Sequence, residues 1–130
     1  MSLRGRRAPD ERGSATAEFS MIAALLVALS LAVVQIAGMV HVRNTLIDAA
    51  STGARFAALH DRTAEDGLER TRALIASSIS DRYARDIRYD YRSAEDGRVV
   101  RITVRAQYPV LGIFGGVGEM EVTGSAYEYP

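Results

Sequence analysis

Few residues of this chain are of a type and spacing that could support catalysis. The 130 residues include two histidines and no cysteine. His41 adjoins a long apolar run and His60 lies in a short polar break, and neither has a second histidine or an acid pair at metal-ligand spacing. The scattered serines and aspartates give no argument for a nucleophilic triad. We therefore expect no enzyme activity, no metal, no cofactor and no small-molecule substrate.

A glycine-rich stretch near the C-terminus, residues 110–118, resembles a phosphate-binding loop only in its glycine content. Such a loop requires a lysine followed by serine or threonine and then a helix, whereas here a strand pattern follows and the chain has no lysine. We expect no nucleotide site. Leu111, Ile113 and Phe114 predict an apolar tip that either touches a partner or the membrane, or packs on the protein's own core.

The segment around Glu18 is the most informative part of the sequence. Glu18 precedes residues 19–42, which carry no formal charge when His41 is neutral. A helix of this length is roughly 36 Å long, enough to cross a bilayer core of about 30 Å. A carboxylate is costly in the membrane core, so Glu18 either lies at headgroup level or has a specific partner. The sequence predicts one transmembrane helix.

Residues 1–13 form a basic, polar leader for which we expect disorder. Arginines are more frequent on this side of the span than close to its other end, where Arg43 follows. The positive-inside rule therefore predicts a cytoplasmic leader and an extracytoplasmic C-terminal domain in the cell membrane. A cleaved secretory signal is an alternative, but its apolar run is usually about 7–15 residues. A retained helix is favoured.

Within the span, small residues recur at a spacing of four. Ala24, Ala28 and Ala32 share one helix face, where a partner helix could approach closely. Gln35 could donate a hydrogen bond across such an interface. Because alanine is common in any membrane helix, the alternative is that this face has no special partner.

Beyond the span, the helical pattern continues and predicts one helix over residues 16–59, roughly 65 Å long. After a break, Thr63 with Asp66 has the spacing of an N-terminal cap, and an amphipathic helix is expected to about Arg85.

Period-two alternation then predicts strands at residues 87–91, 100–108 and 120–126, joined by a hairpin loop at 93–97 and a loop at 110–118. Pro109 is expected to end the second strand. Glu119 and Glu121 are expected to face Arg105 and Arg101 across the sheet. The predicted fold is α+β, a three-stranded antiparallel sheet covered by a helix. Its predicted organisation is a leader at residues 1–13, a transmembrane and stalk helix at 14–60, and a small extracytoplasmic domain at 61–130.

Two motifs at the ends of the long helix carry a family resemblance. Arg12-Gly13 is followed by four small residues and Glu18-Phe19, and the apolar helix runs on into Ala49-Ala50-Ser51-Thr52-Gly53-Ala54-Arg55. The tract from Arg12 to Arg55 resembles the TadE-like minor pilins (pseudopilins) of tight-adherence (Flp, type IVb) pili. The chain departs from the family's frequent residues at Ala24, where a proline is common, and at Gln35, where a glutamate is common.

The resemblance implies a structural or assembly component of a Flp pilus and its Tad secretion system. It implies that a prepilin peptidase cuts between Gly13 and Ser14, with Glu18 and Phe19 serving recognition and assembly. Independently of the resemblance, the small-residue stripe that includes Gly53 is expected to pack helices at close range, and Arg55 ends this helix-packing segment. The partners that the resemblance implies are the peptidase, the membrane, and other pilins or assembly subunits, among them a second minor pilin.

Two further functions stay open at the level of sequence: an unprocessed single-pass envelope binding module, and a secreted domain released by signal peptidase. From Arg43 onward, arginines and acidic residues nearly balance, which gives no electrostatic footprint for nucleic acid.

Overall fold

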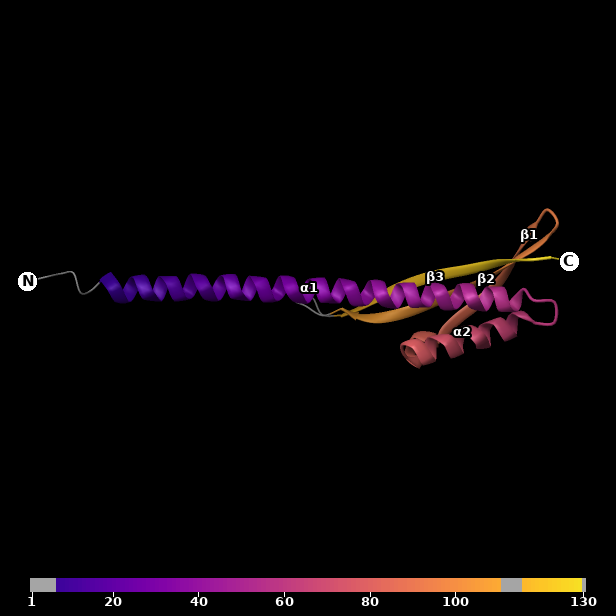
Figure 1. The fold of residues 1–130 in the computed structure, drawn as a ribbon, viewed down its shortest axis with the longest axis horizontal. Coiled ribbons are helices and arrows are strands. Elements are labelled where there is room, and N and C mark those ends of the chain that lie inside the picture. The colour runs from indigo at the N-terminus through magenta and orange to yellow at the C-terminus, as the bar shows by residue number, and fades with distance from the viewer. Residues whose placement is uncertain (1–6, 111–115, 130) are drawn as a thin grey trace, which may run out of the picture. The chain divides into compact units, whose positions relative to one another are not determined.

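The computed structural model describes residues 7–110 and 116–129. The described chain divides into two compact units, residues 1–36 and 37–130, and the first helix contributes to both. The elements follow in the order α1 (Arg7–Ala57), α2 (Ala64–Ser78), the 3-10 helix η2 (Asp81–Ala84), β1 (Asp86–Ala94), β2 (Gly97–Val110) and β3 (Gly116–Glu128). Figure 1 labels the two α-helices and the three strands. The predicted α+β fold is confirmed.

Helix α1 begins earlier and ends slightly earlier than predicted. It runs from Arg7 to Ala57, so residues 7–13 of the leader are helical where we expected disorder. Pro9 lies in the first turn, where backbone N–H groups have no partner within the helix and a proline costs little. Gly13 is unfavourable in a helix by about 1 kcal/mol relative to alanine, which is too little to stop it.

The predicted cap of the second helix is confirmed. The backbone N–H of Asp66 donates to Thr63 Oγ1 over 3.2 Å, and the N–H of Thr63 donates to Asp66 Oδ2 over 2.9 Å. The predicted end at Arg85 is wrong, because α2 stops at Ser78. Ser80 then caps η2 by accepting from the N–H of Arg82, as serines favour caps over helix interiors.

The three strands form one antiparallel sheet in the order β1-β2-β3. Ala94 pairs with Gly97, so the hairpin turn has two residues and is tighter than the predicted loop. Pro109 does not end β2 as predicted but pairs with Val117 of β3. Strand β1 begins at Asp86, opposite Arg105, and does not extend alongside Pro109. At Pro109, β2 is therefore paired with β3 alone, and such an edge position tolerates a residue without a backbone N–H.

The third strand is longer than predicted, because it starts at Gly116. Residues 111–115 of the predicted apolar loop lie outside the described residues.

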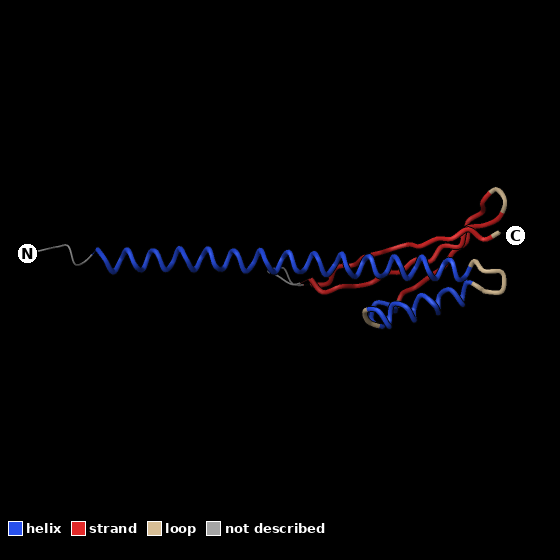
Figure 2. Tube along the Cα trace, in the orientation of Figure 1, coloured by secondary structure: helices blue, strands red, loops and turns tan. Residues whose placement is uncertain are grey.

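One face of the sheet is covered by the C-terminal part of α1 and by α2, which run beside it in Figure 2. From β2 the core receives Val100, Ile102 and Val104, each fully buried. The helices contribute two larger residues, Leu46 and Ile75, to the core. Their other contributions are the small residues Ala49, Ala50, Ala54 and Ala57.

Three glycines allow backbones to meet directly in this core. A Cβ added at Gly124 of β3 would meet the backbone of Ala50 and Ser51 in α1. A Cβ at Gly53 of α1 would lie 2.8 Å from the carbonyl oxygen of Gly67 in α2 and would also meet the Thr71 hydroxyl. Glycine is required at such contacts because they leave no room for a side chain.

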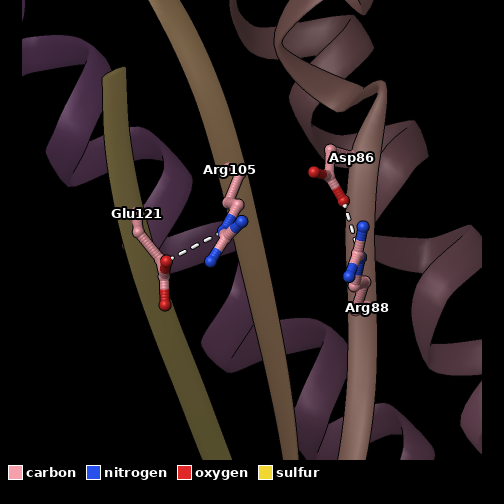
Figure 3. A network of polar contacts seen from close by, with 4 residues as sticks. All are labelled: Asp86, Arg88, Arg105 and Glu121. Carbon is pink, nitrogen blue, oxygen red and sulfur yellow. Dashed lines mark hydrogen bonds and ion pairs between the residues drawn. The ribbon is translucent and has the colours of Figure 1, made fainter.

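The opposite face of the sheet carries a ladder of ion pairs. Arg105 Nε donates to Glu121 Oε2 over 2.9 Å, while Arg88 Nε donates to Asp86 Oδ1 over 3.1 Å, as Figure 3 shows. The sequence predicted that Glu119 and Glu121 face Arg105 and Arg101 without assigning pairs, and the structure pairs Glu121 with Arg105. The pairing predicted for Arg101 is wrong, because Arg101 lies opposite Ser125 of β3 and instead donates two hydrogen bonds to Asp90 of β1.

We expect Gly124→Ala to destabilise residues 37–130, because the new methyl group meets backbone that cannot rotate away. Overpacking of this kind costs about 1–3 kcal/mol, which corresponds to a fall in Tm of at least about 4 °C for a small domain. Circular dichroism melts in detergent would measure it. Ser125→Ala, at the next and exposed residue, is the matched control, and an equal Tm for both variants would contradict the packing described.

The Arg101–Asp90 contact predicts a pH dependence of stability. The hydrogen bonds from Arg101 hold the pKa of Asp90 below its usual value of 3.8. A carboxylate with a lowered folded pKa stabilises the fold above its unfolded pKa, and this contribution is lost as the pH falls through the folded pKa. In melts between about pH 6 and pH 2, Asp90→Asn should therefore lose less Tm than wild type. Asp61→Asn, at an exposed residue between α1 and α2, should behave like wild type, and parallel curves for all three proteins would contradict this assignment.

Candidate processing and membrane segment

The predicted processing site lies on the exposed surface of α1. Gly13, Ser14, Glu18 and Phe19 are all exposed, and a Cβ added at Gly13 would meet nothing within 4 Å. Thr16 Oγ1 donates to the carbonyl oxygen of Arg12 over 2.9 Å, one helical turn back. The Gly13–Ser14 bond is therefore part of a continuous helix that begins at Arg7.

The helix brings two of the predicted site residues together. Ser14 and Glu18 are four residues apart in α1, so they are neighbours on one face. Phe19 is 74 % exposed and starts the apolar surface. A cut at the predicted site would therefore place the new Ser14 ammonium group one helical turn from the Glu18 carboxylate of the same chain.

The apolar surface that follows Phe19 is the most unusual property of α1. Large apolar side chains between residues 19 and 36 are exposed over 57–74 % of their area. The helix contains an 18-residue window with a mean hydropathy of 2.4, none of which is buried within the chain. Exposed apolar area costs roughly 25 cal/mol per Å² in water, so this surface requires an apolar environment. Among the described residues, α1 is the one helix long and apolar enough to cross a membrane.

The predicted helix-packing residues fall in both units. Ala24, Ala28 and Ala32 are exposed on α1, and Gln35 is half-buried. Their packing against another chain stays a prediction.

Farther along α1, Gly53 is buried against α2 whereas Arg55 is exposed. Around Gly53, Ala49, Ala50 and Ala54 are at most 4 % exposed. The small residues of the second sequence motif thus form the surface on which α2 and β3 pack. Their size, rather than any polar group, determines how closely the elements approach.

Sequence reasoning missed the partners of this motif, Gly67, Thr71 and Gly124. Thr71 is fully buried and its hydroxyl donates to the carbonyl oxygen of Gly67 over 2.8 Å. A glycine inside a helix and another inside a strand are the signals that could have identified two of them, because both positions are unfavourable without a packing reason.

The histidines lie apart from one another in the sequence and on different surfaces. His41 lines a groove with Thr45 and Leu74, while His60 lines a surface with Arg98 and Glu128. Within residues 7–110 and 116–129, no three histidine, cysteine, aspartate or glutamate side chains are grouped to hold a metal ion.

The comparisons with known proteins agree with this geometry. Residues 13–55 match the family model described as TadE-like protein, a range that begins at the predicted cleavage site and ends with the buried small-residue surface. Neither the curated proteins nor the solved structures gave a match. The segment 13–55 of α1 is thus similar to the TadE-like family, in agreement with the resemblance of the two motifs.

Proposed function

We propose that this protein is a TadE-like minor pilin, a structural or assembly component of a tight-adherence (Flp) pilus. The observation that carries the proposal is the family match over residues 13–55. That range joins an exposed apolar helix to a buried surface of small residues in the same α1. The apolar part anchors the chain in the cell membrane as a single span, and the buried part attaches the α+β unit. The leader lies in the cytoplasm and the α+β unit outside.

The first step in this function is hydrolysis of the Gly13–Ser14 peptide bond by a prepilin peptidase. Water adds across the bond, leaving a carboxylate on Gly13 and an ammonium group on Ser14. Gly13 suits close approach of an enzyme because it has no side chain and nothing within 4 Å of its Cβ direction. The cut removes the seven residues Arg7 to Gly13 from the start of α1.

The second step is the use of Glu18 in assembly with other pilins. Its carboxylate pairs with the Ser14 ammonium of a neighbouring subunit when the apolar helices associate. Removing one partner from a buried ion pair costs about 3–5 kcal/mol, because the other charge is left uncompensated in an apolar environment. The pair therefore fixes the axial register of neighbouring helices.

We expect the mature protein to begin at Ser14 when it is isolated from membranes that contain an active prepilin peptidase. Intact mass and N-terminal sequencing would show it. Gly13→Val should abolish the cut, because the side chain blocks approach to the bond, while Gly38→Val in the same helix should not. Both glycines have open space around them in this structure. An uncut N-terminus in wild type would favour the unprocessed binding module, and a terminus near residue 38 would indicate a secreted domain.

We also expect Glu18→Gln to reduce pilus yield at least tenfold in cells lacking the wild-type copy, because the neutral amide cannot form the ion pair. Counting pili by electron microscopy would measure the effect. Glu11→Gln makes the same chemical change in the leader, which is removed before assembly, and should leave the yield unchanged. Wild-type pilus numbers with Glu18→Gln would exclude the proposed role of the carboxylate.

A further inference from the structure

A groove of about 400 Å³ opens in residues 37–130 where η2 meets the ends of β2 and β3. Helix η2 and the residue after it contribute two arginines, and the strands contribute a third. The groove residues that matter for its chemistry are Arg82, Arg85, Arg105, Tyr108, Asp86 and Glu119.

Two of these charges are already neutralised. Arg105 is bonded to Glu121, and Asp86 to Arg88, as Figure 3 shows. Arg82 Nη2 donates to the hydroxyl of Tyr83 over 2.7 Å, which is a neutral partner. Arg85 is exposed and forms no ion pair within the described part of the chain. Of the remaining charges in the groove, Arg82 and Arg85 are positive and Glu119 is negative, so the groove has a net charge of one positive unit.

The level of the groove along α1 follows from the packing of β3. Gly124 lies against Ala50 and Ser51, and Glu128 lines a surface with His60, so β3 runs parallel to α1. Going back five residues from Gly124 to Glu119 covers about 16 Å of strand, which equals about 11 residues of helix. Glu119 therefore lies near the level of Met39, within the last turns of the charge-free run.

Helix α2 gives the same result independently. Gly67 near its start contacts Gly53 and Ala57, whereas Ser78 at its end lines a groove with His41 and Thr45. Helix α2 is thus antiparallel to α1, as Figure 2 shows, and η2 follows Ser78 at the His41 end. The arginine groove therefore lies at the end of residues 37–130 where the apolar part of α1 finishes.

We propose that this groove binds the phosphate groups of anionic phospholipids at the surface of the membrane that α1 spans. The inference rests on the proposed membrane anchoring. Guanidinium groups bind phosphate oxygens with two parallel hydrogen bonds, and arginines close to a membrane surface are attracted to anionic headgroups. Arg82 and Arg85 make this contact, and Tyr108 adds an aromatic ring of the kind that favours the membrane interface. The contact seats the α+β unit against the bilayer.

The experiment uses the full chain in lipid nanodiscs. Because the sequence has no cysteine, a single fluorophore can be placed at Ser77→Cys near the groove end of α2, or at Ser93→Cys beside the hairpin turn. Headgroup-attached quenchers report proximity to the bilayer. We expect quenching at position 77 to rise at least twofold when roughly one third of a neutral bilayer is replaced by anionic phospholipid, and to fall again in about 1 M salt. Position 93 should not respond.

Matched charge changes assign the effect. The double variant Arg82→Gln/Arg85→Gln should abolish the rise in quenching at position 77. The single variant Arg85→Gln should reduce it. Arg72→Gln with Arg92→Gln removes the same charge from exposed residues elsewhere and should preserve the rise. Equal quenching in neutral and anionic nanodiscs, or equal loss in both sets of variants, would overturn the proposal and leave the groove to a protein partner. Co-elution with nanodiscs tests membrane insertion separately, so a failure of anchoring is distinguishable from a failure of headgroup binding.

Discussion

At Gly124 the backbone of β3 lies against the backbone of α1 at Ala50 and Ser51. The packing of residues 37–130 depends on this contact, because it sets the distance between the helix layer and the sheet. Gly53 and Gly67 set the distance between the two helices in the same way. Larger apolar residues, such as Leu46, Ile75 and Ile102, fill the space around these contacts. A small core gains rigidity from such backbone contacts, since they leave few alternative packings.

Helix α1 changes its kind of surface along its length without interruption. Between residues 19 and 36 large apolar side chains face outward, whereas between 49 and 57 one stripe consists of small, buried residues. The first surface requires an apolar solvent and the second requires a folded partner. Because both belong to one helix, the α+β unit needs no separate linker to its apolar segment, and the family match to residues 13–55 covers both surfaces.

Much of this arrangement could be predicted from the sequence, because periodicity and capping are local properties. The α+β class and the cap at Thr63 both follow from residue spacing. The errors came from effects that spacing does not contain. Arg101 forms its ion pair with Asp90 of β1 rather than with a glutamate of β3. Pro109 is tolerated within β2 because β1 does not extend past the position of Arg105. The proposed processing at Gly13–Ser14 depends on a peptidase, so neither the pattern nor the fold of this chain alone determines it.

The continuity of α1 also has a mechanical consequence. From Ser14 to Ala57 the helix contains no proline, and Gly38 is the one glycine between Gly13 and Gly53. Tension applied to the C-terminal end of α1 is thus carried by successive turns of backbone hydrogen bonds, because no non-helical segment interrupts the helix. Glycine favours the helix by about 1 kcal/mol less than alanine, so Gly38 is the residue of lowest intrinsic helix propensity between Gly13 and Gly53.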